Sequence, residues 1–287
     1  VDANTGAIDL STATAGNYQV TYTTANSGNW QQLGQDIDGE ADNDWSGKSV
    51  SMNAAGNRLA IGAHGNDVNG TNSGHVRIFD WNGNNWTQLG NDIDGEAAGD
   101  RSGFSTYMNA NGDRVAIGAR INSGNGTDAG HVRIYDWNGT VWSQLGTDID
   151  GEAGGDYSGQ SVSLSSDGNT VAIGAYYNDG NGTNSGHVRI YEWNGTAWAQ
   201  LGTDIDGEAG GDHSGYSVSM NATGDRVAIG APYNQGTGVN SGHVRIYEWN
   251  TTNWTQLGND IDGEAAGDES GFSTYMNANG DRVAIGA

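Results

Sequence analysis

The sequence has no cysteine, few basic residues and no long apolar run, and each of these absences excludes a class of protein. Without cysteine among its 287 residues, the chain has neither a disulfide framework nor thiol chemistry. Eleven Lys and Arg stand against thirty-five Asp and Glu, a net charge of −24. This charge disfavours nucleic-acid partners, because affinity for polyanions comes largely from neutralising phosphates. No run approaches the roughly 20 apolar residues of a membrane-spanning helix, so we expect no membrane insertion.

A unit of 56 residues recurs through the chain. Five units start at Trp30, Trp86, Trp142, Trp198 and Trp254, with no insertion or deletion between them. A fixed period of this size is typical of propellers, solenoids and arrays. We therefore divide the chain into an N-terminal segment, residues 1–29, and a five-unit array, residues 30–287.

Each unit has the pattern of four short strands. In the unit that starts at Trp198 and its continuation, we expect strands at residues 216–220, 226–231, 243–249 and 254–257. In the second strand Ala228 and Gly230 leave one face nearly bare, which allows close backbone approach near a crowded axis. No stretch has helical periodicity. Four antiparallel strands per repeat predict an all-β fold, a β-propeller of about five blades.

Two short motifs carry a family resemblance. Ser214-Gly-Tyr-Ser-Val218, Gly230-Ala-Pro-Tyr233 and the pairs Gly103-Phe104 and Gly271-Phe272 resemble the FG-GAP repeats of integrin α-subunits and of bacterial surface proteins. The resemblance covers residues 30–287 and implies a propeller and a secreted or surface location. The family's calcium loop lies between the first two strands. Here that turn is short, as at Asn221 to Asp225, so we expect no calcium there.

The two ends of the chain are complementary fragments of the unit. The last unit stops after its second strand, and residues 8–29 occupy the frame of the missing third and fourth strands. The N-terminal segment also resembles the last two strands of a bacterial Ig-like domain. We predict that the strand from Tyr18 to Tyr22 pairs beside residues 282–285. Pairing within one chain would close a ring, and pairing between chains would give a head-to-tail polymer.

An acidic loop follows the fourth strand of every unit and is the candidate metal site. Flexible loops rich in carboxylates suit hard cations, so calcium is the candidate cofactor. The alternative is a solvated loop whose Asp and Ser side chains bond its own backbone. The candidate ligands are Asp36, Asp38, Glu40, Asp44, Asp92, Asp94, Glu96, Asp100, Asp148, Asp150, Glu152, Asp156, Asp204, Asp206, Glu208, Asp212, Asp260, Asp262, Glu264 and Asp268.

Histidines and tryptophans also repeat with the unit. His75, His131, His187 and His243 open the third strands, and their repetition favours a structural role such as bonding a neighbouring backbone group. Tryptophans at 81/86, 137/142, 193/198 and 249/254 flank the third-to-fourth hairpins, where we expect them to pack across the strands rather than to stack on sugars.

Nine Asn-x-Ser/Thr sequons are candidate glycosylation sites. Asparagine, glycine and threonine also suit turns, so the sequons have a purely structural alternative. They lie at Asn69, Asn85, Asn125, Asn138, Asn181, Asn194, Asn221, Asn250 and Asn253.

The sequence is compatible with three functions. Near-exact repetition and an acidic surface favour an extracellular structural or adhesive repeat protein that associates with itself. The alternative is a calcium-dependent module that binds a surface glycan or protein. A glycosidase fits least, because its two carboxylates need distinct surroundings and the loops have nearly one sequence. The same equivalence gives no unique Ser/His/Asp trio, so we predict no catalytic residues and no enzyme.

Overall fold

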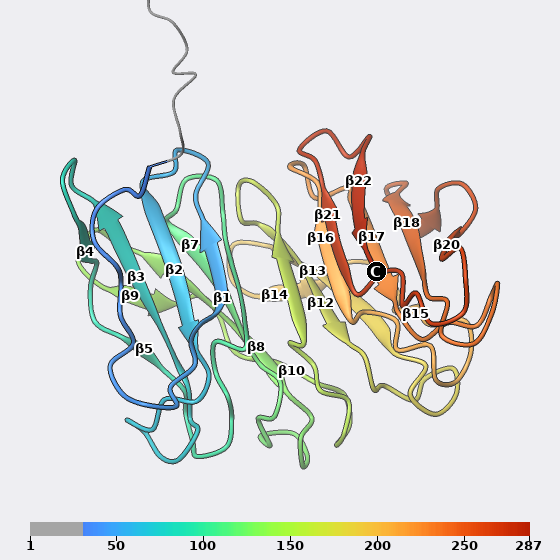
Figure 1. Cartoon of the computed structure of the whole chain (residues 1–287), viewed down its shortest axis with the longest axis horizontal. Coiled ribbons are helices and arrows are strands. Elements are labelled where there is room, and N and C mark those ends of the chain that lie inside the picture. The colour runs from blue at the N-terminus through green and yellow to red at the C-terminus, as the bar shows by residue number, and fades with distance from the viewer. Residues whose placement is uncertain (1–30) are drawn as a thin grey trace, which may run out of the picture. The chain divides into compact units, whose positions relative to one another are not determined.

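The computed structural model describes residues 31–287, and residues 34–287 form one compact unit. The described residues are built of β-strands and turns, without a helix (Figure 1). Among them, accordingly, no helix has the length and apolar character needed to cross a membrane. The predicted all-β fold is confirmed.

The strands repeat in the order expected from one unit. The first strands are β1 (Ser46–Met52), β6 (Ser105–Met108), β11 (Ser161–Leu164), β16 (Ser217–Met220) and β21 (Ser273–Met276). The second strands are β2 (Arg58–Ala63), β7 (Arg114–Ala119), β12 (Thr170–Ala175), β17 (Arg226–Ala231) and β22 (Val283–Gly286). The third strands are β3 (His75–Trp81), β8 (His131–Trp137), β13 (His187–Trp193) and β18 (His243–Trp249).

The fourth strand of each blade is interrupted. Its first part is β4 (Trp86–Gln88), β9 (Trp142–Gln144), β14 (Trp198–Gln200) or β19 (Trp254–Gln256). Its second part is β5 (Ile93–Asp94), β10 (Ile149–Asp150), β15 (Ile205–Asp206) or β20 (Ile261–Asp262). Both parts pair with the third strand of the same blade. The expectation that the acidic segment is wholly loop was therefore wrong for its Ile-Asp dipeptide, since the buried isoleucine and the backbone pairing hold it in the sheet.

Four blades are complete antiparallel sheets, and the fifth contains two strands among the described residues. In the complete blades the second strand pairs with the first on one side and the third on the other. In the fifth, β22 pairs with β21. The predicted partner of β22, the strand from Tyr18 to Tyr22, lies outside the described residues.

The first strands converge on one axis. Each contacts the first strand of the next blade, and backbone hydrogen bonds link the successive turns, from Ala54 N to Ala110 O at 3.0 Å and onward to Ala278 O. Residues from all five units line a cavity of about 200 Å³ at this end, among them Met52, Met108 and Met276. The predicted propeller of about five blades with a 56-residue repeat is confirmed.

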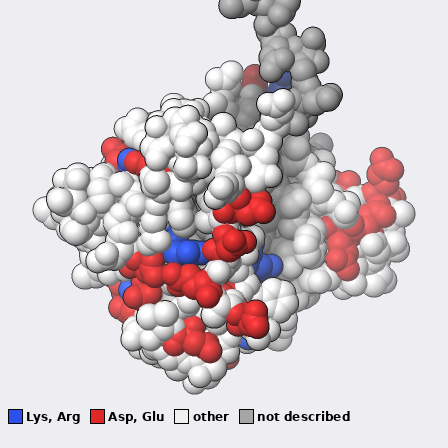
Figure 2. Space-filling model, turned by 60° about the vertical axis from the view of Figure 1, so that its left-hand side comes forward, with Lys and Arg blue, Asp and Glu red and all other residues white. Residues whose placement is uncertain are grey.

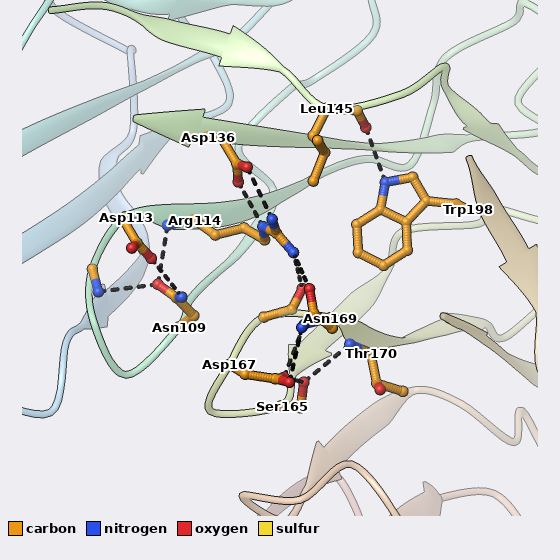
Figure 3. Close-up of polar contacts among 12 residues, drawn as sticks. Asn109, Asp113, Arg114, Asp136, Leu145, Ser165, Asp167, Asn169, Thr170 and Trp198 are labelled. Atoms are coloured by element: carbon orange, nitrogen blue, oxygen red, sulfur yellow. Dashed lines mark hydrogen bonds and ion pairs between the residues drawn. The ribbon is translucent and has the colours of Figure 1, made fainter. Parts of the chain in front are cut away.

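Blades pack through backbone, apolar and polar contacts. Gly174, on the bare face of β12, lies so close to Gly215 that a Cβ would come within 2.0 Å of its carbonyl oxygen. The tightness predicted for this face is thus observed. Ile173 and Val171 lie in the apolar core between their own blade and the preceding blade. At the same junction Trp198 Nε1 donates to Leu145 O at 2.9 Å (Figure 3).

Candidate functional site

The second-to-third and fourth-to-first loops share one face, as expected from alternating strands. In three units an asparagine of the second-to-third loop donates its side-chain amide to a glycine carbonyl of the acidic fourth-to-first loop, at 2.7–2.8 Å. The pairs are Asn69–Gly95, Asn125–Gly151 and Asn181–Gly207. Figure 2 shows acidic side chains gathered in bands on the surface, with few basic ones between them.

The last aspartate of each acidic loop bonds the loop itself. Asp156 Oδ2 accepts from Ala153 N at 3.0 Å and from the Asn178 side chain at 3.1 Å, and it is 4% exposed. The same loop contact recurs at the four equivalent aspartates, Asp44, Asp100, Asp212 and Asp268. For these residues the structure matches the alternative of a self-bonded loop.

In four of the five loops the backbone carbonyl of the second aspartate accepts a hydrogen bond from an arginine of the following blade. Arg133 Nη2 donates to Asp94 O at 2.7 Å, and the pairs formed by Asp38, Asp150 and Asp206 are alike. Burial, followed by the charge of Asp92, raises the pKa of Asp94. Asp262 is an exposed member of the set, on β20.

The first aspartate and the glutamate of the loops are brought together around a histidine. Histidine Nδ1 lies 3.7–3.9 Å from one oxygen of each carboxylate. We call these groups the Glu–His–Asp trios: Glu40–His75–Asp92, Glu96–His131–Asp148, Glu152–His187–Asp204 and Glu208–His243–Asp260. The glutamate belongs to the connection that enters a blade, and the other two residues belong to that blade. Among the described residues, Asp36 and Glu264 are in no trio.

The trio histidines are buried and poorly bonded. Their side chains are 1% exposed, and neither ring nitrogen of His75 or His187 has a hydrogen-bond partner. The expected bond to a neighbouring backbone group was therefore wrong for these two. Burial, with a smaller contribution from Arg133 or Arg189, lowers the pKa of His131 and of His187 to about 4. Burial also lowers the pKa of His243.

Each trio carboxylate is oriented from its far side. Gln144 Nε2 donates to Asp148 Oδ1 at 2.6 Å, which leaves Oδ2 facing His131. Gln88, Gln200 and Gln256 do the same for Asp92, Asp204 and Asp260. An arginine Nη1 lies 3.6–3.7 Å from the other oxygen of each glutamate. Sequence reasoning missed the trios because their members lie 17 to 52 residues apart.

The sequons divide into three environments. Those at Asn85, Asn138, Asn194, Asn250 and Asn253 are exposed in the third-to-fourth hairpins. Those at Asn69, Asn125 and Asn181 donate their amides to the acidic loop. Asn221 is 3% exposed and donates to Asp225 at 2.6 Å, so a glycan there requires this bond to break. Glycosylation of the exposed set stays a prediction.

The tryptophan pairs pack across their hairpins as predicted. Trp193 is directly opposite Trp198 in the sheet, with ring centroids 5.5 Å apart. The other three pairs have centroids 5.4–5.5 Å apart.

A second candidate site is formed by the positions at which the units differ. Tyr176 and Tyr177 stack with ring centroids 4.1 Å apart, and His213 meets them edge-on. We define the aromatic cluster as Tyr157, Tyr176, Tyr177, His213, Tyr216 and Tyr233, linked by ring contacts. Other units have Arg101, Arg120 or Glu269 at equivalent positions. A comparison of the five units shows from the sequence that these positions vary. That the rings contact one another can be seen only in the structure.

Comparison with known proteins supports this architecture. Residues 147–191 match the FG-GAP repeat. The predicted FG-GAP resemblance is thus confirmed over one stretch of the array, which extends from the fourth strand of one blade to the third strand of the next. No curated protein matches the chain.

Solved structures share the fold at low sequence identity. The periplasmic gluconolactonase PpgL of Pseudomonas aeruginosa is 12% identical, with a TM-score of 0.55, over 83% of this chain and 64% of that one. A candidate 6-phosphogluconolactonase of Bacteroides fragilis is also 12% identical, with a TM-score of 0.53, over 83% and 57%. The hydrazine synthase of Kuenenia stuttgartiensis has a TM-score of 0.51 at 12% identity, over 83% and 60%. The chain therefore spans about three fifths of the length of these structures, and the likeness shows the propeller fold alone.

Proposed function

We propose that this chain is a structural and adhesive repeat module of an extracellular surface protein, and that it associates end to end by strand complementation. The observation that carries the proposal is the outer edge of β22, which has no third strand beside it in the described part of the chain. Every other second strand pairs with a third strand of seven residues, whereas β22 pairs only with β21 among the described residues. Unpaired edges of this kind are templates for an added strand.

The opposite end of the array offers a matching apolar surface. On β1, Met52 is 49% exposed, although its equivalents Met108 and Met220 are 2% and 3% exposed. Val50 is 61% exposed, although its equivalents Val162 and Val218 are 6% and 8% exposed. Inner positions are buried because the preceding blade covers them. A neighbouring copy that supplied strands to β22 would extend the array and bury such faces, adding backbone bonds of about 1 kcal/mol net each.

The test is the solution mass over a range of protein concentrations. We expect the mass to rise with concentration, and we expect Tyr275→Lys to reduce association, because Tyr275 is 66% exposed on β21. Val239→Lys is the matched control, since Val239 is equally exposed but lies in a loop of a complete blade. A mass of one chain at every concentration would contradict end-to-end association. A fall in melting temperature on removing residues 1–29 would then indicate closure within one chain.

The aromatic cluster supports a second candidate, a carbohydrate-binding face. Around the buried Tyr176, the other tyrosines of the cluster are partly exposed. Partly exposed tyrosine rings offer flat apolar surfaces with polar edges, which suits sugar rings. Binding of the wild-type chain to a panel of surface polysaccharides should be lost in Tyr177→Ala and kept in Tyr275→Ala. Equal binding by both variants would contradict a role for the cluster. Repeating the assay with calcium and with a chelator tests the predicted calcium dependence.

A further inference from the structure

We propose that each Glu–His–Asp trio binds one divalent transition-metal ion of the zinc class, so that the described array binds four such ions between successive units. The inference is independent of the proposed function. It assigns a ligand role to the four histidines and to eight of the twenty carboxylates, and it replaces calcium by a different class of ion at these positions.

The buried histidine is the observation that separates the trios from an ordinary acidic surface. An imidazole that is 1% exposed normally has hydrogen-bond partners, yet both nitrogens of His75 and of His187 lack one. In all four trios Nδ1 faces two carboxylate oxygens at 3.7–3.9 Å, too far for a hydrogen bond. In the trios of His75, His187 and His243, an ion between these three atoms would satisfy Nδ1, which has no hydrogen-bond partner there.

The spacing of the three ligand atoms fits a small ion. All lie within 4.8 Å of one another. Zinc binds nitrogen and oxygen at about 2.0–2.2 Å, so two ligands at a tetrahedral angle are about 3.4 Å apart. The histidine–carboxylate distances of 3.7–3.9 Å exceed this by a few tenths of an ångström, and rotation of the half-exposed glutamate can bring its oxygen closer to the other two ligand atoms. Three protein ligands leave a fourth position for water.

The donor set selects the class of ion. One imidazole and two carboxylates suit zinc and neighbouring first-row metals, whereas calcium takes six to eight oxygen ligands. The glutamine bonded to each trio aspartate fixes the carboxylate, as outer partners do in metal sites. The arginine near each glutamate opposes the ion's charge, but the chain's charge of −24 offsets it.

Zinc titration of the untagged chain tests the proposal, with bound metal counted after dialysis. We expect four ions per wild-type chain and three for Glu208→Gln, which removes a ligand from one trio. Glu264→Gln is the matched control: Glu264 stands in the same Asp-Ile-Asp-Gly-Glu sequence but belongs to no trio in the described array, so four ions should remain. Fewer than one ion in the wild type, or equal losses in both variants, would overturn the proposal.

X-ray absorption on the zinc-loaded wild-type chain needs no variant. We expect one imidazole nitrogen and oxygen ligands around each ion, at distances near 2.0–2.2 Å. A shell of oxygen alone would overturn the assignment of the histidines. In a competition arm, calcium at tenfold excess should displace less than half of the zinc, and full displacement would indicate oxygen-only loop sites instead.

Discussion

Residues 91–119 and 259–287 are nearly identical in sequence but have different surroundings. They differ only in Arg101 against Glu269. Ile93 is 5% exposed and its counterpart Ile261 is 40% exposed. Ala116, at 0% exposure, lies under the next blade, and its counterpart Ala284 is exposed. The first segment contains β5 and β7, which belong to complete blades, whereas the second segment ends in β22 (Figure 1).

The burial of a blade therefore depends on the blade that follows it. The second strands β7 and β22 have the same residues from Val to Gly, yet within residues 31–287 only β7 is flanked by a third strand and covered by a following first strand. Repeat arrays gain much of their stability at such junctions. Matched substitutions in the two segments therefore separate what a residue contributes within its hairpin from what it contributes between blades.

The largest difference should come from truncating the central isoleucine. Ile117 is 1% exposed in a core cluster, so Ile117→Ala should lower the free energy of unfolding by about 4 kcal/mol through lost burial and a cavity. Ile285 is half-buried against a smaller cluster, and Ile285→Ala should cost about 1 kcal/mol. Urea unfolding followed by tryptophan fluorescence, at a concentration where the chain is monomeric, gives both values. Equal costs would show that the neighbouring blade adds nothing at this position.

A smaller difference is expected at the close glycine. A Cβ at Gly118 would lie 2.2 Å from Gly159 O in the next blade, so Gly118→Ala should cost about 2–3 kcal/mol by forcing the blades apart. At Gly286 the nearest atom is the Ser273 hydroxyl, which can rotate away. Gly286→Ala should therefore change the melting temperature little. If both variants melt at the same temperature, the close approach of blades is not limiting.

The smallest difference should come from the arginine that ties one blade to the next. Arg114 donates to Gly168 O at 3.0 Å and Asn169 Oδ1 at 2.8 Å while pairing with Asp136 (Figure 3). A lysine cannot form this fork, so Arg114→Lys should cost about 1 kcal/mol. Arg282 is exposed, and Arg282→Lys should have no measurable effect on the urea midpoint. A comparable loss in both would mean that the hydrogen bonds from Arg114 to the next blade are not the cause of the loss.

Local patterning predicted most of the blade. The expected second and third strands, residues 226–231 and 243–249, have the observed bounds. Alternation, turn glycines and the cross-hairpin tryptophans act within one unit, and their physics is short-range. The interruption of the fourth strand was missed, because a two-residue strand such as Ile205–Asp206 is defined by its pairing with β13 rather than by its own pattern.

The period, the strand order and the positions where carboxylates and histidines recur follow from the sequence, because a repeat of constant length places equivalent residues at equivalent positions in each blade. The tertiary structure alone decided which of these residues meet. His131 and Asp148 belong to one blade, while Glu96 arrives from the connection before it, and only stacking of units places the three around one point. The tertiary structure also decided whether side chains of identical segments are buried or exposed, because their burial depends on whether a neighbouring blade covers them.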